Sequence, residues 1–315
     1  MTKTVRICHY KKLKIKLNGD VYPCCTSYPH TKLGNIFDEN IYQKIENANI
    51  ICECPMFKSV ERTPEDKIDL DYIHYETSNI CQASCVCCPQ CKDKMQNEEQ
   101  HLEKIREIIE HYKPKNIIAI GGEILVQEKA FNDLFELKKK YPEMKISTIT
   151  NLCVGKERLK KAEEIFDKMT VSMLGFTELT YKNEMGLDFS KTMDNFNELY
   201  ENKKVKLSPK YLAMPTNLFE IIPFFNWAIN LDVKKIYLHC IHEFEQVANL
   251  KNPYWTKTFA KVEKQLKSIL ENNKELLISK NRHFISIHTI LAEKTNINQQ
   301  YIDDAGLTNI IRITV

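Results

Sequence analysis

The cysteines carry the clearest chemical signal in this sequence. Twelve cysteines occur among 315 residues, and most of them fall into two groups. The first group lies within the first 54 residues: Cys8, Cys24, Cys25, Cys52 and Cys54. The second group occupies eleven positions: Cys81, Cys85, Cys87, Cys88 and Cys91. In a reducing compartment, cysteines at this density indicate metal binding rather than disulfide bonds.

The second group contains a C-x3-C-x2-C spacing made by Cys81, Cys85 and Cys88. A [4Fe–4S] cluster is usually held by four thiolates, so three leave one iron with an open position. An open iron can bind a small molecule and pass an electron to it. The alternative is zinc, because Cys85, Cys88 and Cys91 also repeat at a spacing that suits a tetrahedral site.

The composition sets limits on where this chemistry takes place. Hydrophobic residues make up 43% of the chain, enough for a packed core. Lys plus Arg total 45 against 42 for Asp plus Glu, a balance that gives no argument for nucleic acid as a partner. The charged amino terminus does not resemble a signal peptide, and no run of 18 apolar residues could span a membrane. We therefore expect a cytoplasmic protein with no membrane contact.

The elements that position the cysteines follow from the hydrophobic pattern. Residues 13–25 predict a β-hairpin with Asn18-Gly19 at its turn, and residues 41–48 predict a short helix. From residue 67 onward, strands alternate with helices, which is typical of a parallel sheet with crossover helices. We expect strands at 68–76, 116–122, 145–151, 170–174, 205–214 and 234–241. We expect helices at 100–112, 129–141, 157–169, 193–202, 218–231 and 256–272. The predicted fold class is α/β, an incomplete (β/α)6 TIM-like barrel preceded by a small cysteine-rich hairpin and helix domain.

The C-x3-C-x2-C motif after the first strand of this region resembles the motif of the radical S-adenosylmethionine (radical SAM) superfamily. Three weaker motifs follow in the family's order along residues 67–275. They contribute the SAM-binding residues that the resemblance implies: Gly121, Gly122, Glu123, Asn151 and Ser172. The sequence departs from the family where Cys87, Ile124 and Leu152 replace an aromatic residue, a proline and a glycine. Purely structural roles are the alternative, with the glycines ending a strand and Ser172 capping a helix.

The first cysteine group resembles the SPASM and twitch domains, which hold auxiliary [4Fe–4S] clusters. Cys8, Gly19 and Cys24 match the C-x(9–15)-G-x4-C opening of those domains. The resemblance implies Cys52 and Cys54 as the remaining ligands, with Cys25 as a possible replacement for one of them. Five cysteines are too few for two clusters, so we expect one, and a zinc site is the alternative. The expected domains are residues 1–66 (auxiliary cluster), 67–275 (radical SAM barrel) and 276–315 (carboxyl-terminal extension).

The resemblance implies an enzyme of oxidoreductase or isomerase type that reductively cleaves SAM and removes a hydrogen atom from a substrate carbon. A reductant such as flavodoxin or ferredoxin would supply the electron. The SPASM resemblance favours a peptide substrate, modified by crosslinking or epimerisation. The alternatives are a sugar, nucleotide-sugar or aminocyclitol substrate and, in another class, a non-catalytic zinc-binding interaction module. The sequence does not fix the substrate.

Cys240 is a further catalytic candidate, in the strand expected at 234–241. Strand side chains alternate, so Ile236, Leu238 and Cys240 share one face. If that face points into the barrel, the thiol could donate a hydrogen atom to a substrate radical. The alternative is a buried structural cysteine.

Overall fold

The computed structural model forms two compact units, which are described separately. It describes residues 3–7, 12–23, 32–48, 58–62, 70–88, 98–214, 216–240, 261–262, 264–266, 268–269, 271–273, 275 and 284–288. The first unit comprises Met1–Gln82, Gln90–Thr148 and Glu164–Asp167. The second comprises Ala83–Pro89, Ile149–Glu163 and Lys168–Val315. Both predicted domain boundaries, near residues 66 and 275, adjoin stretches outside the described residues.

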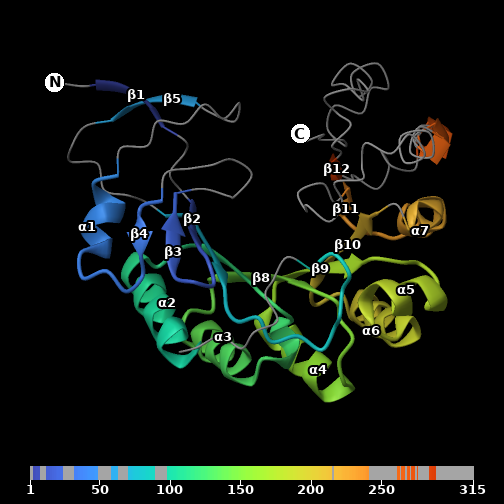
Figure 1. The fold of residues 1–315 in the computed structure, drawn as a ribbon, viewed down its shortest axis with the longest axis horizontal. Helices are drawn as coiled ribbons and strands as arrows, with labels where there is room; N and C mark the ends of the chain where they lie inside the picture. The colour runs from blue at the N-terminus through green and yellow to red at the C-terminus, as the bar shows by residue number, and fades with distance from the viewer. Residues whose placement is uncertain are drawn as a thin grey trace. The chain divides into compact units, whose positions relative to one another are not determined.

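The first unit is built on a sheet with the strand order β8-β7-β6-β2-β3-β4 (Figure 1). Its parallel core consists of β6 (Tyr72–Glu76), β7 (Asn116–Ile120) and β8 (Lys145–Thr150), the last of which continues into the second unit. The predicted hairpin is confirmed as β2 (Lys12–Ile15) and β3 (Asp20–Tyr22). Gly19 lies in its turn with φ +82°, a conformation that favours glycine. β2 pairs in parallel with β6, so the hairpin extends the sheet.

Short elements complete the amino-terminal part of this unit. β4 (Gly34–Asn35) pairs with β3, and α1 (Ile41–Glu46) confirms the predicted short helix. β1 (Lys3–Ile7) and β5 (Lys58–Arg62) form a separate antiparallel pair that the sequence analysis did not predict.

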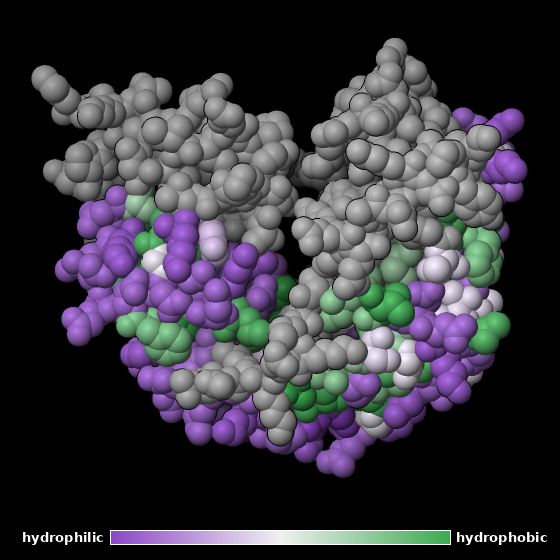
Figure 2. All heavy atoms as spheres, in the orientation of Figure 1, coloured by the Kyte–Doolittle hydropathy of each residue, from purple (hydrophilic) through white to green (hydrophobic). Residues whose placement is uncertain are grey.

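Two crossover helices cover the parallel strands of the first unit. α2 (Glu98–Tyr112) and α3 (Glu128–Lys140) each bury one apolar stripe, with Ile105 and Leu134 almost fully buried. Their other faces are charged, as expected for amphipathic helices at a surface. Hydrophilic side chains accordingly predominate on the visible face over α2 (Figure 2).

The second unit contains parallel strands in the order β12-β11-β10-β9. They are β9 (Lys168–Met173), β10 (Lys206–Ala213), β11 (Lys235–Cys240) and β12 (Phe284–His288). The helices are α4 (Lys156–Ile165), α5 (Glu178–Met185), α6 (Phe189–Asn202) and α7 (Ile221–Ala228). The buried Tyr211 of β10 packs on Phe224 of α7, with ring centroids 5.1 Å apart, so this side of β10 faces the helices.

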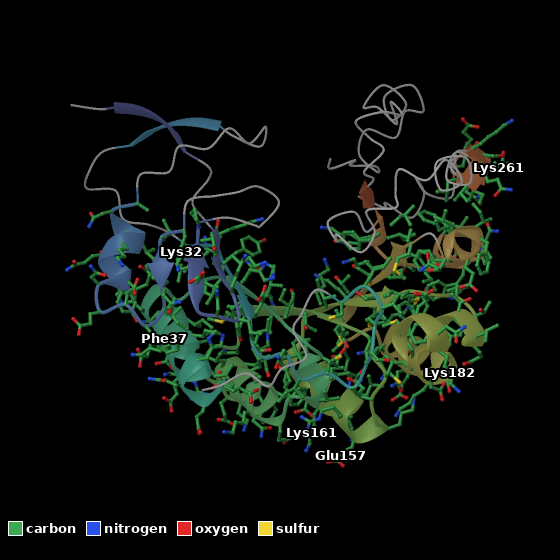
Figure 3. All side chains as sticks on the ribbon, in the orientation of Figure 1. Lys32, Phe37, Glu157, Lys161, Lys182 and Lys261 are labelled. Atoms are coloured by element: carbon green, nitrogen blue, oxygen red, sulfur yellow. The ribbon has the colours of Figure 1, made fainter. Side chains whose placement is uncertain are left out.

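The lysines of α4 form a solvated face, as the sequence suggested. Glu157 and Lys161 point outward (Figure 3) and pair across one helical turn at 3.2 Å. Exposed pairs of this kind contribute little to stability.

The structure confirms the predicted fold class. Five strand–helix units, from β6 to α7, match the prediction, and β11 follows them, whereas the helix expected at 256–272 lies partly outside the described residues. The helix expected at 157–169 ends at Ile165, because Lys168 already pairs in β9. Residues 284–288, which could not be placed from sequence, form β12 beside β11. Helix α5 was missed. Among the described residues, no helix is long and apolar enough to cross a membrane.

Candidate functional site

The candidate site centres on residues 77–88, which follow β6 and are called here the cysteine loop. Cys81 and Cys88 are exposed, whereas Cys85 and Cys87 are half-buried. The amide of Cys88 donates a hydrogen bond to the carbonyl of Cys85 at 3.2 Å, which forms a turn between these two cysteines. Along the chain, the loop passes from the first unit into the second after Gln82.

In the first unit, the buried side chain of Gln127 holds the start of the cysteine loop. Gln127 is 1% exposed and lies between the helical turn 124–126 and α3. Its Nε2 donates to the carbonyl oxygens of Ser78, Ile80 and Gly121 at 3.1–3.3 Å. Its Oε1 accepts from the Thr77 hydroxyl at 2.5 Å. One side chain therefore ties the backbone before Cys81 to the end of β7.

Gly121 and Gly122 allow the cysteine loop to lie directly against the end of β7. Both have positive φ, +112° and +29°. A Cβ on Gly121 would lie 2.6 Å from the Ser78 carbonyl oxygen, and a Cβ on Gly122 would overlap the carbonyl of Ile80. Any larger residue would push the loop away. The structure therefore shows that the two glycines are needed for close packing of the loop. The SAM contact predicted for them stays a prediction.

Glu123 completes this turn from a buried position. It is 1% exposed, its amide donates to the Ile80 carbonyl at 2.9 Å, and its carboxylate accepts from the Leu125 amide at 3.1 Å. The carboxylate caps the short helical turn 124–126. Its predicted contact with the SAM amino group stays a prediction.

In the second unit, the carboxyl-terminal end of α5 holds the other half of the cysteine loop. The amides of Ser84 and Val86 donate to the carbonyls of Met185 and Glu184 at 2.9 and 3.0 Å. The helix ends at Gly186, whose φ is +69°. A Cβ at Gly186 would overlap the Ser84 hydroxyl, so only glycine allows the loop to approach this closely. α5 therefore fixes the backbone on both sides of Cys85.

Charged groups surround Cys87, which lies between two predicted cluster ligands. Burial, with Cys88 and Glu184 nearby, raises the pKa of the Cys87 thiol to about 12. The positive charge of Lys210 on β10 has the opposite effect and lowers the pKa of the Cys87 thiol. Burial also lowers the pKa of Lys210 to about 8. At neutral pH the Cys87 thiol is thus protonated beside a lysine ammonium.

The turn after β8 contains the predicted Asn151. Its backbone carbonyl accepts from the Thr192 hydroxyl at 3.2 Å, and its Oδ1 accepts from the Cys153 amide at 2.9 Å. Leu152, which stands where the family has glycine, adopts φ +60°. Asn195 of α6 holds this turn by donating to the Leu152 carbonyl at 2.8 Å. Leu152 thus adopts the positive φ that is typical of glycine at this position.

Ser172 and Cys240 lie on β9 and β11, the two strands that flank β10 in the second unit's sheet. Ser172 is half-buried on β9 and in register with Lys210 of β10. Cys240 is in register with Ala213, at the end of β11. The side chain of Cys240 lies outside the described residues, so its role as a hydrogen donor stays a prediction.

The cysteine loop fits an iron–sulfur cluster by its donor chemistry. It offers four thiols within eight positions, three of them in the C-x3-C-x2-C spacing, and hydrogen bonds hold its backbone before Cys81 and around Cys85. Within the described residues, however, no three His, Cys, Asp or Glu side chains form a group that could hold a metal ion. The predicted auxiliary ligands lie outside the described residues: Cys8, Cys24, Cys52 and Cys54, together with Cys25. Cys91 lies outside them as well.

Comparison with known families identifies the two cysteine regions. The sequence profile of the radical SAM superfamily matches residues 75–226, which include the cysteine loop and the strands from β7 to β10. The profile of SPASM, an iron–sulfur cluster-binding domain, matches residues 8–69. Residues 75–226 therefore form a radical SAM domain, and residues 8–69 form an iron–sulfur SPASM domain that precedes it along the chain. These two domains support SAM and [4Fe–4S] clusters as cofactors.

Several solved structures share the fold of this chain. Streptococcus suis SuiB bound to its precursor peptide SuiA is 11% identical, with a TM-score of 0.51 over 87% of this chain and 71% of that chain. SuiB bound to S-adenosylmethionine is 12% identical, with a TM-score of 0.51 over 64% and 48%. Native anSMEcpe with bound AdoMet and the Kp18Cys peptide is 21% identical, with a TM-score of 0.51 over 68% and 63%.

These identities show a common fold and no more. This chain spans about half the length of SAM-bound SuiB. No curated protein matches the sequence.

Three residues that hold or adjoin the cysteine loop were missed by sequence reasoning: Gln127, Gly186 and Lys210. Gly186 carries a weak signal as a glycine beyond a helical segment. Lys210 has no distinct sequence signal, because the same strand also contains Lys206 and Ser208. Gln127 has no sequence signal, because its four partners lie 6 to 50 positions away.

Proposed function

We propose that this protein reductively cleaves SAM and uses the resulting radical to modify a peptide, by forming a crosslink or inverting a stereocentre. The observation that carries the proposal is the braced C-x3-C-x2-C loop in a chain that also has a SPASM domain. The likeness to SuiB bound to a precursor peptide, which extends over 87% of this chain, supports a peptide as the substrate. The reaction class is then that of an oxidoreductase or an isomerase.

The proposal gives each site residue a role. Cys81, Cys85 and Cys88 hold the SAM-binding cluster. SAM is held by the five residues at the strand ends: Gly121, Gly122, Glu123, Asn151 and Ser172. The auxiliary cluster is held by Cys8, Cys24, Cys52 and Cys54. When bound, the cluster and SAM supply the 5′-deoxyadenosyl radical that removes a hydrogen atom from an unactivated carbon.

The chain's own contribution is to hold the reacting groups in place. Gln127 and the two glycines fix the backbone before Cys81, and α5 fixes the backbone around Cys85. A rigid loop keeps the thiol positions constant and reduces the reorganisation needed when cofactors bind. A flavodoxin or ferredoxin is the proposed reductant partner.

The function can be tested with anaerobically reconstituted protein, SAM, dithionite and a library of synthetic peptides, analysed by mass spectrometry. A crosslinking enzyme removes two hydrogen atoms from the peptide per crosslink. An epimerising enzyme leaves the mass of the peptide unchanged in water. In deuterated water, one hydrogen of the peptide is replaced by one deuterium. Cleavage of SAM that leaves every peptide unchanged but converts a nucleotide sugar would overturn the peptide proposal and leave the radical SAM assignment intact.

A further inference from the structure

Three neighbouring strands of the second unit each begin with a lysine. β9, β10 and β11 lie side by side in the sheet (Figure 1), and their first residues are Lys168, Lys206 and Lys235. Lys168 and Lys206 are directly in register. These three residues, called here the lysine row, lie at the edge of the sheet where the strands start.

The lysine row lies on the face of the sheet opposite the one that packs on α7. Tyr211 of β10 contacts Phe224 of α7, and side chains alternate along a strand, so Lys206 is on the other face. Its register partner Lys168 shares that face. On β11, Lys235 is on the same side as Tyr237, the register partner of Lys210, which also lies opposite the α7 side.

Tyr237 contacts the lysine row directly. The Lys168 Nζ donates a hydrogen bond to the Tyr237 hydroxyl at 3.4 Å and lies 5.7 Å from the centroid of the Tyr237 ring. Because the hydroxyl oxygen accepts this bond, its own proton can be donated to a further acceptor. Lys168 and Tyr237 are both half-buried, whereas Lys206 is exposed.

The positive charge of the row is not balanced by a carboxylate on Lys168 or Lys206. Within the part of the chain that the structure describes, neither lysine forms an ion pair. Asp167, which precedes Lys168, bonds instead to Lys138 and Lys145 at 2.8 and 3.0 Å. Burial and the nearby charge of Lys235 lower the pKa of Lys168 to about 8. An anion bound here would supply the missing negative charge.

The surroundings suit a carboxylate better than a phosphate. Phosphate sites commonly use the N–H groups at a helix N-terminus. At this edge α4 and α6 instead reach their C-terminal ends, at Ile165 and Asn202, shortly before the lysines of β9 and β10. A helix C-terminus carries partial negative charge, which disfavours a doubly charged group nearby. Lysine ammonium groups with a tyrosine hydroxyl are suitable donors for a carboxylate.

The lysine row is also separate from the SAM-binding residues proposed above. Ser172 lies four residues after Lys168 on β9, which corresponds to about 13 Å along the strand. The row therefore lies at the opposite end of the strand from the predicted SAM contact.

We propose that the lysine row and Tyr237 bind an acidic side chain, aspartate or glutamate, of the peptide substrate. Adjacent strands are about 4.8 Å apart, so the flexible side chains of two neighbouring lysines can reach one carboxylate. The inference rests on the proposed function, because it takes the substrate to be a peptide, and it adds a preference for acidic residues to that function.

The test measures the affinity of anaerobically reconstituted protein for two fluorescently labelled peptides by fluorescence anisotropy. One peptide has alternating glutamates, and the other has glutamines at the same positions. Inorganic pyrophosphate is added as a competitor in separate titrations. The variants are Lys206→Met, Lys168→Met combined with Lys206→Met, and Lys234→Met. Lys234 is a matched control, because it is an exposed lysine one residue before β11 and outside the row.

We expect the wild-type protein to prefer the glutamate peptide, and the double variant to bind it about tenfold more weakly or worse. The affinity for the glutamine peptide should not change. Lys206→Met alone should show part of this loss. Because Lys206 is exposed, its substitution tests the site even if the double variant fails to fold, which its melting temperature reports. Lys234→Met should stay within about twofold of wild type.

Three results would overturn the inference. The first is a wild-type protein that does not distinguish the two peptides. The second is an equal loss of affinity in Lys234→Met and Lys206→Met, which would indicate a diffuse effect of charge. The third is binding of pyrophosphate that depends on the row without any preference for glutamate, which would indicate a phosphate site. Failure of the proposed function has a different signature, because the wild-type protein then forms no 5′-deoxyadenosine, whichever peptide it binds.

Discussion

The side-chain amide of Gln127 donates a hydrogen bond to the carbonyl oxygen of Ile80, 3.1 Å away and one residue before Cys81. The same amide also reaches the carbonyls of Ser78 and Gly121. A residue outside the cysteine motif thus determines the backbone path on which the first cysteine lies. Around the second cysteine of the motif, carbonyl groups at the end of α5 accept hydrogen bonds from the amides of Ser84 and Val86 and fix the backbone there.

Replacing Gln127 with Leu should destabilise the protein and lower its cluster content. The substitution leaves buried carbonyl oxygens without a donor, a loss of about 2–3 kcal/mol in the free energy of unfolding. Denaturant titration measures the stability, and iron per chain after reconstitution measures the cluster. Asn132→Leu is the control, because Asn132 lies exposed on α3, the helix that follows Gln127, and bonds only to Glu128 among the described residues. Wild-type iron content in Gln127→Leu would contradict a role in positioning the loop.

Gly186→Ala should displace Ser84 and loosen the cysteine loop. The positive φ alone makes the change unfavourable by about 1–2 kcal/mol, and the new methyl group overlaps the Ser84 hydroxyl. We expect reduced iron retention during gel filtration, partly restored by adding Ser84→Gly. Gly155→Ala is the matched control, since a Cβ there meets nothing within 4 Å. Equal iron retention in the Gly186 and Gly155 variants would show that α5 does not hold the cluster loop.

The architecture followed from the sequence because its signals are local. The spacing of apolar residues along the sequence indicates the strands and the amphipathic helices, and the Asn18-Gly19 pair indicates the turn of the hairpin. Helix α5 was missed because its sequence, ELTYKNEM, lacks a clear apolar stripe. Its buried residues are Tyr181, Glu184 and Met185, of which one is a carboxylate.

The site was predictable only as far as its motifs extend. The C-x3-C-x2-C spacing indicated the metal-binding loop, and the Gly121-Gly122 pair was recognised. The packing of those glycines on Ser78 and Ile80 depends on contacts between strands that are distant in sequence. The unpaired ammonium of Lys210 depends on which neighbours lie in register, and no single-sequence pattern reports that.

The stability of the cluster-free protein should depend on pH through Lys210. Burial lowers the pKa of this lysine from 10.5 to about 8, so between these values the unfolded chain binds more protons than the folded one. Stability therefore rises with pH across this window, and the cost of charging Lys210 is fully present below pH 8. Lys210→Met should exceed wild type by up to about 3 kcal/mol at pH 7, with a difference that shrinks toward pH 10.5. If the difference in the free energy of unfolding between Lys210→Met and wild type stayed constant with pH, burial would not lower the pKa of Lys210.

The amino-terminal cysteines should hold one auxiliary cluster. We expect about eight irons per chain in the wild-type protein, and about four after Cys8, Cys24, Cys52 and Cys54 are all changed to Ala. Iron and zinc are measured together by mass spectrometry. One zinc per wild-type chain, lost in the quadruple variant with no loss of iron, would identify a zinc site instead.

The most direct test of the whole account is the formation of 5′-deoxyadenosine from SAM by anaerobically reconstituted protein with dithionite. The wild-type protein should form it, and Cys87→Ser combined with Cys91→Ser should retain the activity, because neither thiol is a required ligand. Changing Cys81, Cys85 and Cys88 together to Ala should abolish it. Undiminished formation of 5′-deoxyadenosine by this triple variant would contradict the assignment of the cysteine loop as the SAM-binding cluster site.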